Sequence, residues 1–234
     1  MPEIRQLTVD GRFNGPDGSA NGGYVCGSFA RLCPAPVAVT LHAPPRLDRP
    51  LRAEVGGRRA HLWDGDQLIA TAAPTEHRVG HVDPVSWEEA VRASGLYRGQ
   101  VNHPYPRCFA CGPDREPGDG LLLAPGPVPG RAATVACPWV PDEAAGTGED
   151  GRVAAEFVWS VLDCPSGWTA DLVAAPRVLG WMRAELETSP APGDRCVVVG
   201  RLDTGDDHGF ASTSVLYDSR GTALARATTR WYAP

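Results

Sequence analysis

The sequence predicts an α+β protein made of two similar halves, each with one buried helix followed by antiparallel strands. The first observation is an approximate internal repeat: "HLWDGDQLIATA" (61–72) and "VLYDSRGTALARA" (215–227) each have the pattern of a strand, a tight turn and a second strand. The second is an apolar helix candidate ahead of each group of strands. A chain of 234 residues is long enough to bury a large shared core.

The two helix candidates lie at 21–32 and 153–162. In "NGGYVCGSFARL" the residues Tyr24, Gly27, Ser28 and Arg31 recur at helical spacing, and "VAAEFVWSVL" carries an apolar stripe. The segments 37–55 and 178–202 each predict a strand, a proline-containing turn and another strand. Each half therefore has one helix and a set of antiparallel strands.

A connector, roughly 74–107, separates the halves. Ser86 and Glu89 form a capping-box pattern that predicts a short helix from about Pro84 to Ser94. The stretch "GQVNHPYPR" (99–107) reads as an extended linker, and 141–151 as a loop. We therefore expect an N-terminal repeat over 1–80, a connector over 81–107 and a C-terminal repeat over 108–234.

Asp163 stands directly after the second apolar stripe, in "AEFVWSVLDCPSGWTA" (155–170). Pro165 has no N–H for the carbonyl of Val161, so we expect the helix to kink or end near Asp163. Two interpretations follow. Asp163 is either the N-cap of a further helical segment or a carboxylate exposed to a pocket.

The stretch "CFACGPDREPGDGLLL" (108–123) resembles the CFxCGxxNPxGLxL opening of many hotdog-fold thioesterases. In that family the central helix often begins His-Gly-Gly and carries an Asp nine residues after the His. Here Ala154 stands nine residues before Asp163, whereas Asn21-Gly22-Gly23 matches the start of the first helix and Ala30 takes the acid's place. The resemblance implies two tandem hotdog folds, each a central helix wrapped by an antiparallel sheet, forming a pseudo-dimer with a continuous sheet.

The resemblance also implies a single composite site. The first repeat keeps the glycines and the second keeps the acid. Backbone N–H groups at a helix start stabilise a developing oxyanion, and this role falls to Gly22 and Gly23, with Asn21 as cap or side-chain donor. Asp163 would then activate water. The expected substrate-binding residues are Asn14, as an upstream amide, and the aromatic residues Tyr24, Trp159 and Trp168, although aromatic residues at helical spacing are more often core.

The function predicted in this way is hydrolysis of an acyl-CoA or acyl-carrier-protein thioester. One alternative is a non-hydrolytic protein that binds an acyl thioester or a related small molecule, because half of each ancestral site is missing. Another is a repurposed hotdog enzyme of a biosynthetic pathway that catalyses elimination or cyclisation. A dehydratase is disfavoured, since neither helix candidate contains the histidine that this chemistry uses.

Seven cysteines, an odd number, without a visible secretory signal favour reduced thiols and a cytoplasmic location. Cys108 and Cys111 form half of a zinc-ribbon pattern, but no second pair follows. His103 lies upstream, and Cys137 and Cys164 are remote in sequence. We therefore predict no metal and no cofactor, and interpret Cys26 and Cys164 as small apolar residues.

The net charge of −6 and a pI of about 5.5 give no reason to expect binding to nucleic acid or to an anionic membrane. No apolar run approaches the length of a membrane span. The expected partners are an acyl thioester and a second copy of the chain in a homodimer.

Overall fold

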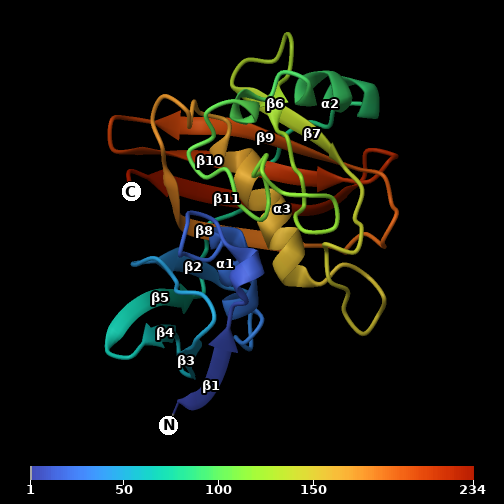
Figure 1. The fold of residues 1–234 in the computed structure, drawn as a ribbon. Helices are drawn as coiled ribbons and strands as arrows, with labels where there is room; N and C mark the ends of the chain where they lie inside the picture. The colour runs from blue at the N-terminus through green and yellow to red at the C-terminus, as the bar shows by residue number, and fades with distance from the viewer. Residues whose placement is uncertain (1) are drawn as a thin grey trace.

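A computed structural model describes residues 2–234 and contains one sheet with helices packed against it (Figure 1). The helices are α1 (Gly22–Ala30), α2 (Trp87–Ser94) and α3 (Ala155–Gly167). The strands are β1 (Glu3–Thr8), β2 (Ala38–Leu41), β3 (Pro50–Val55), β4 (Ala60–Asp64), β5 (Gln67–Ala73), β6 (Gly126–Pro127), β7 (Thr134–Trp139), β8 (Val178–Leu186), β9 (Cys196–Gly205), β10 (Gly209–Tyr217) and β11 (Ala223–Tyr232).

All eleven strands belong to a single antiparallel sheet in the order β1-β3-β4-β5-β2-β8-β11-β10-β9-β7-β6. The five strands of the first repeat lie on one side and the six of the second on the other. The two sets join where β2 pairs with β8, with Val39 opposite Met182 at the centre of the junction. The predicted tandem hotdog fold with a continuous sheet is confirmed.

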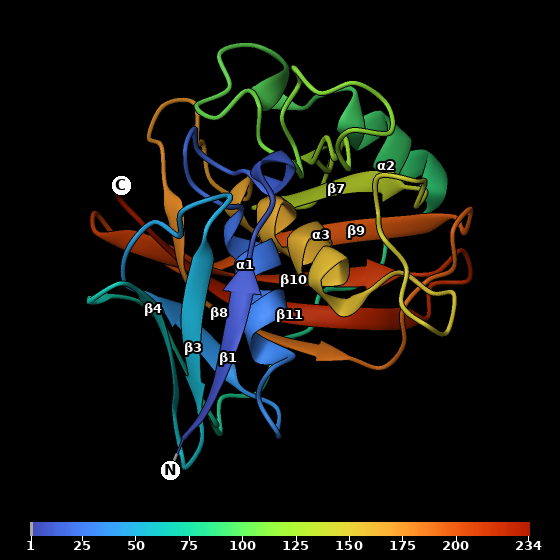
Figure 2. The ribbon, with the colours of Figure 1, turned by 60° about the horizontal axis from the view of Figure 1, so that its bottom comes forward.

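Helices α1 and α3 lie side by side within the curve of the sheet (Figure 2). Two glycines of α1 allow their close approach. A Cβ on Gly23 would lie 2.7 Å from the carbonyl oxygen of Trp159, and one on Gly27 would lie 2.8 Å from the Cα of Glu156. Side chains at either position would push the helices apart, so the sequence sets the helix spacing here.

The hydrophobic core is continuous across the two repeats. Phe29 and Leu62 of the first repeat and Leu162 and Leu216 of the second belong to the same buried cluster, and none of the four is exposed to solvent. A smaller cluster lies under α2 and includes Val197 and Val215. The shared core fixes α1 against α3, and thereby places residues of one repeat next to those of the other.

Most predicted elements are present. The tight turns connect β4 to β5 and β10 to β11, and the Ser86–Glu89 capping box forms with both of its hydrogen bonds. Helix α2 begins at Trp87, three residues later than expected, because Ser86 itself is the N-cap. The stretch 99–107 is not wholly extended, since a short 3-10 helix covers Arg98–Gln100.

The helix α3 does not end near Asp163, as one form of the expectation had it, because it continues through Pro165 to Gly167. Side-chain hydroxyl groups bind carbonyls next to the proline: Ser214 Oγ donates to the Leu162 carbonyl (2.7 Å) and Ser166 Oγ to that of Asp163 (2.6 Å). Asp163 therefore lies inside a continuous helix, and the N-cap interpretation is also wrong.

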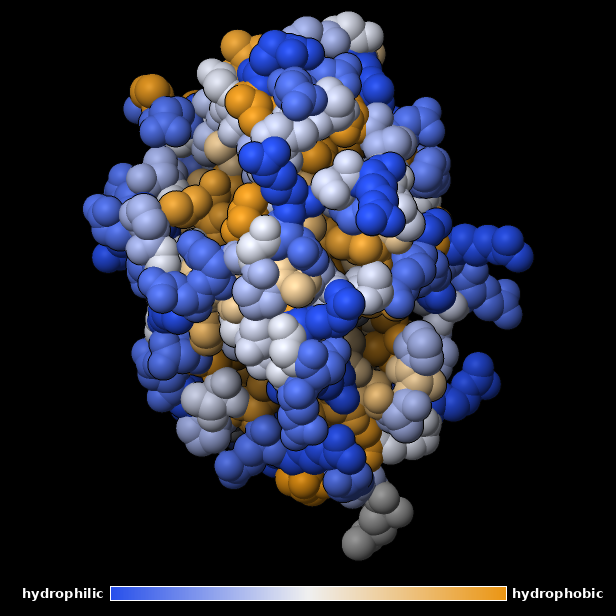
Figure 3. All heavy atoms as spheres, turned by 90° about the vertical axis from the view of Figure 1, so that its right-hand side faces the viewer, coloured by the Kyte–Doolittle hydropathy of each residue, from blue (hydrophilic) through white to orange (hydrophobic). Residues whose placement is uncertain are grey.

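On the face of the molecule drawn in Figure 3, hydrophobic residues are interspersed among hydrophilic ones. Within residues 2–234, none of the helices is long and apolar enough to span a membrane.

Candidate active site

The carboxylate of Asp163 lies at the N-terminus of α1, which belongs to the other repeat. Its Oδ2 accepts hydrogen bonds from the backbone N–H of Gly23 (2.9 Å) and from Nδ2 of Asn21 (3.2 Å). The partial positive charge at a helix N-terminus favours an anion at this place. The structure thus brings together the glycines of the first repeat and the acid of the second.

Asn21 has two roles in this arrangement. Its Oδ1 accepts the backbone N–H of Tyr24 (2.9 Å) and so caps α1, and its Nδ2 is thereby directed at Asp163. The side chain is buried, and the cap fixes its orientation. Asn21 is therefore both the start signal of α1 and a donor to the carboxylate.

The two oxygens of Asp163 have different surroundings. Oδ2 has two donors, whereas Oδ1 is buried without a hydrogen-bond partner. Burial raises the pKa of Asp163 to about 7. The hydrogen bond from Gly23 acts in the opposite direction and lowers the pKa, nearby Cys108 raises it, and the hydrogen bond from Asn21 lowers it. A buried carboxylate with one free oxygen is a candidate for proton transfer.

Asp163 lines a pocket of about 540 Å³ together with Asn21 and Gly22. As the first residue of α1, Gly22 has an N–H without an intrahelical partner. Much of the remaining wall is apolar and comes from both repeats, including Leu41, Trp168, Leu172, Leu179 and Trp231. This wall suits an apolar ligand bound beside the carboxylate.

Three of the predicted substrate-binding residues lie outside this pocket. The side chain of Asn14 is engaged elsewhere, because Nδ2 donates to the Gly15 carbonyl (3.0 Å) and Oδ1 accepts from Arg115. Tyr24 stacks on Phe13 with ring centroids 4.2 Å apart, and Trp159 packs against Gly27. Of the four expected substrate-binding residues, Trp168 lines the pocket, whereas Asn14, Tyr24 and Trp159 lie outside its lining.

The expected use of Gly23 also needs correction. Its N–H is directed at Asp163 and not at the pocket, since the helices cross so closely at this residue. Of the two glycines, Gly22 is the pocket-lining one. Sequence patterns do not show where two helices cross, so the different positions of Gly22 and Gly23 could not be predicted from the sequence.

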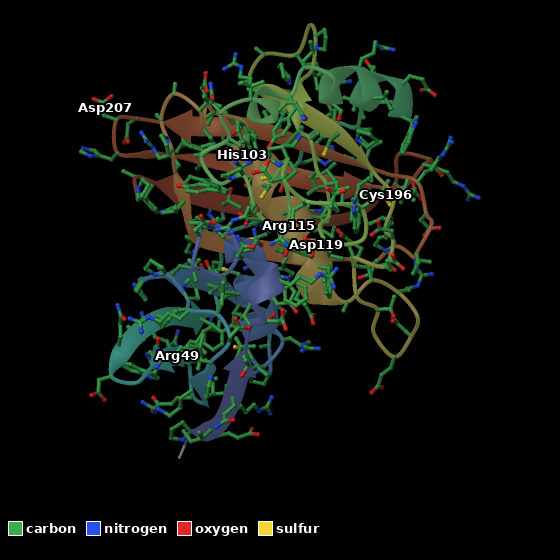
Figure 4. All side chains as sticks on the ribbon, in the orientation of Figure 1. Arg49, His103, Arg115, Asp119, Cys196 and Asp207 are labelled. Atoms are coloured by element: carbon green, nitrogen blue, oxygen red, sulfur yellow. The ribbon has the colours of Figure 1, made fainter. Side chains whose placement is uncertain are left out.

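A group of sulfur atoms lies in the same wall and was missed by the sequence analysis. The Sγ atoms of Cys108, Cys111 and Cys164 all lie within 4.8 Å of one another, and His103 Nε2 is 3.4 Å from Cys111 Sγ. Figure 4 shows His103 beside sulfur atoms in the middle of the molecule, whereas Cys196 lies away from them. The CFACG motif marked two of these cysteines, but no pattern linked them to Cys164.

Several solved structures match this one over nearly the full chain. The tesB protein of Mycobacterium avium subspecies paratuberculosis has a TM-score of 0.62 at 13% identity, with 99% of this chain and 93% of that chain covered. A protein of Novosphingobium aromaticivorans named as a thioesterase has a TM-score of 0.62 at 14% identity, with 99% and 95% covered. A conserved protein with a hot dog fold from Alicyclobacillus acidocaldarius has a TM-score of 0.58 at 14% identity, with 99% and 94% covered.

At these identities the likeness establishes the fold and leaves the chemistry to be argued from the site. No protein-family model matches the chain, and no curated protein sequence matches it either.

Proposed function

We propose that the chain is a thioester hydrolase acting on an acyl-CoA or an acyl-carrier-protein, with one composite site. The observation that carries the proposal is the placement of Asp163. It is a buried carboxylate of the second repeat, held at the helix N-terminus of the first. One of its oxygens has no hydrogen-bond partner, and the residue lines the pocket. Hydrolysis needs a group that takes a proton from water and donors that stabilise the oxyanion.

The roles divide among neighbouring groups. Asn21 and Gly23 hold Oδ2 of Asp163, so Oδ1 is the oxygen that accepts the proton of the attacking water. The Gly22 N–H, free of intrahelical bonding, is the donor for the thioester carbonyl oxygen. As water attacks, the carbonyl becomes a tetrahedral oxyanion, and its collapse expels the thiolate, which takes the proton from Asp163.

The apolar part of the pocket would receive the acyl chain. Trp168 and Leu172 come from the second repeat and Leu41 from the first, so the chain would lie between the repeats. The names of two similar solved structures, a tesB protein and a protein named as a thioesterase, agree with this class of reaction. The predicted homodimer and cytoplasmic location stay predictions.

The test measures thiol release from a panel of acyl-CoAs of increasing chain length. We expect wild-type turnover and a loss of about 10²- to 10⁴-fold in kcat for Asp163→Asn, the usual effect of removing a general base. Glu156→Gln is the matched control, because Glu156 is a second buried carboxylate on α3 that lies outside the pocket. It should keep wild-type turnover.

Unchanged thermal unfolding of Asp163→Asn would establish that the loss is chemical. Absence of wild-type turnover with every acyl-CoA and with acylated carrier protein would overturn the proposal and favour a non-hydrolytic binding protein. Full activity of Asp163→Asn would overturn the assignment of the base.

A further inference from the structure

Two elements distant in sequence bring three thiols together at the pocket wall. Cys108 and Cys111 come from the CFACG loop and Cys164 from α3, and the Sγ atoms of Cys108 and Cys164 are 3.7 Å apart. Each cysteine is at most 5% exposed and lines the pocket. Among residues 2–234, this is the one group of three His, Cys, Asp or Glu side chains close enough together to hold a metal ion.

We propose that Cys108, Cys111 and Cys164 bind a thiophilic metal ion, Zn²⁺ by the chemistry of the ligands, with a fourth position open to the pocket. Cysteine thiolates are common zinc ligands, and a site with three protein ligands leaves the fourth position for water or a substrate atom. A Zn–S bond of ~2.3 Å in a tetrahedral site places two sulfurs about 3.8 Å apart. The Cys108–Cys164 separation of 3.7 Å meets this requirement.

Hydrogen-bond donors surround the sulfurs. The indole N–H of Trp168 donates to Cys111 Sγ (3.4 Å), and Asn21 Nδ2 lies 3.8 Å from Cys108 Sγ. A neutral thiol is a weak acceptor, whereas a metal-bound thiolate is a strong one, and such outer donors are typical of metal sites.

The CFACG loop holds its two thiols through a tight turn. The Gly112 N–H donates to the Cys108 carbonyl (2.8 Å), which closes the loop. A Cβ on Gly112 would lie 2.4 Å from the Pro106 carbonyl oxygen and 2.5 Å from the Cys108 nitrogen, so only glycine fits. The backbone therefore fixes the positions of Cys108 and Cys111 independently of any ion.

His103 is a donor to the site and not a ligand in this arrangement. Its Nδ1 accepts the backbone N–H of Tyr105 (2.8 Å), so the ring proton is on Nε2. Nε2 lies 3.4 Å from Cys111 Sγ and donates to it. Three thiolates then remain as ligands, and the fourth position faces the pocket, where water or a ligand atom would complete the coordination.

The sequence prediction of no metal rested on the absence of a second cysteine pair. The third thiol comes instead from α3, one residue after Asp163. The remaining cysteines, Cys26, Cys33, Cys137 and Cys196, have no such sulfur neighbours among the described residues. A disulfide is the competing use of two close thiols, but it would leave the third thiol and the surrounding donors unexplained.

The test begins with the full chain purified under reducing conditions without chelator. We expect about one zinc per chain by elemental analysis. After the ion is removed by chelation, Co²⁺ should restore binding and give the intense near-ultraviolet thiolate-to-cobalt absorption that reports sulfur ligands. Cys164→Ser should weaken Co²⁺ binding by at least about 100-fold, because even outer-shell changes cost 10- to 100-fold. Cys137→Ser is the control, since Cys137 is buried on β7 and should leave Co²⁺ binding unchanged.

Wild-type protein without zinc and without thiolate-to-cobalt absorption would overturn the proposal, whether or not Cys164→Ser folds. A disulfide between two of the three cysteines in metal-free native protein would overturn it in favour of a redox pair. Equal loss of Co²⁺ binding in both variants would overturn the ligand assignment. None of these measurements depends on thioester hydrolysis, so the metal site and the hydrolase proposal can fail separately.

Discussion

At the scale of single residues, Gly22 and Gly23 are neighbours with different constraints. A Cβ on Gly23 would meet backbone atoms of α3, 2.7 Å from the Trp159 carbonyl oxygen and 2.9 Å from the Cα of Ser160. A Cβ on Gly22 would meet Leu179 alone, 2.9 Å from Cδ2 and 3.0 Å from Cβ, and would touch no backbone atom of α3. The contact at Gly23 cannot relax unless α1 and α3 move apart.

We therefore expect Gly23→Ala to lower the free energy of unfolding by about 1–3 kcal/mol, the usual cost of overpacking. Gly22→Ala is the matched control on the same helix, and alanine's better helix propensity should make it nearly neutral. Urea-induced unfolding followed by tryptophan fluorescence measures both. Equal stability of the two variants would contradict the close crossing of α1 and α3 at Gly23.

Trp168 allows a second prediction at this scale, which rests on the proposed metal site. Trp168→Phe keeps an aromatic ring but removes the indole N–H that binds Cys111 Sγ. We expect Co²⁺ affinity to fall about 10-fold or more while the three-thiolate absorption stays, since all ligands remain. Competition with a chelator of known affinity measures the change. Unchanged affinity would show that the indole N–H does not support the sulfur.

The candidate site was predictable where short motifs mark it. Asn21, Gly22, Gly23 and Asp163, which the structure brings together, were candidates from the sequence, because the helix start leaves a local signal and the place of Asp163 resembles that of the family's acid. The cluster with Cys164 was not, since the contact between the CFACG loop and α3 depends on tertiary packing. The same reason explains why Gly23 was expected to face the substrate and faces Asp163 instead.

At the scale of elements, α3 shows how packing overrides a local signal. Pro165 predicts a helix end, yet the helix continues to Gly167. Ser166 accounts for much of this: its Oγ donates to the Asp163 carbonyl (2.6 Å) and accepts from Trp231 Nε1 (3.1 Å) and Thr229 Oγ1 (2.8 Å). The last turn is thus held to β11 by side chains, which no helix-breaking rule takes into account.

Removal of this hydroxyl should destabilise the protein. We expect Ser166→Ala to lower the free energy of unfolding by about 1–3 kcal/mol, because buried donors lose their acceptor. Ser160→Ala is the control, since Ser160 is equally buried on α3 but bonds only the Glu156 carbonyl of its own helix (3.1 Å). Thermal and urea unfolding compare the two. A Ser160→Ala change as costly as Ser166→Ala would refute a special role for the last turn.

At the scale of the whole molecule, the two repeats agree in fold but differ in chemistry. The internal repeat predicted two similar halves, and the resemblance to hotdog proteins added the continuous sheet that joins them. At the place equivalent to the site, α3 begins with Ala154 and Ala155 in place of Asn21 and Gly22, and α1 carries Ala30 where the acid would stand. The symmetry of the backbone therefore does not extend to the functional groups.

In the second repeat, the start of α3 is the position equivalent to the site, and other interactions occupy it. Glu156 Oε1 lies 3.6 Å from Arg31 Nη2, and Phe157 packs edge-on against Tyr24 with ring centroids 5.3 Å apart. Burial, and then the nearby charge of Glu156, raise the pKa of Tyr24 to about 12. An ion pair and an aromatic cluster thus lie at the start of α3, where the other repeat has a donor set beside a pocket.

This asymmetry predicts one ligand per chain, whatever the number of chains in the assembly. A non-hydrolysable acyl-CoA thioether titrated into the protein should saturate at one equivalent per chain by calorimetry. Glu156→Gln should leave that stoichiometry unchanged, because Glu156 lies outside the pocket, whereas Leu179→Trp should abolish binding by filling the wall beside Gly22. Two equivalents per chain, or binding that Glu156→Gln halves, would show that the second repeat has kept a site of its own.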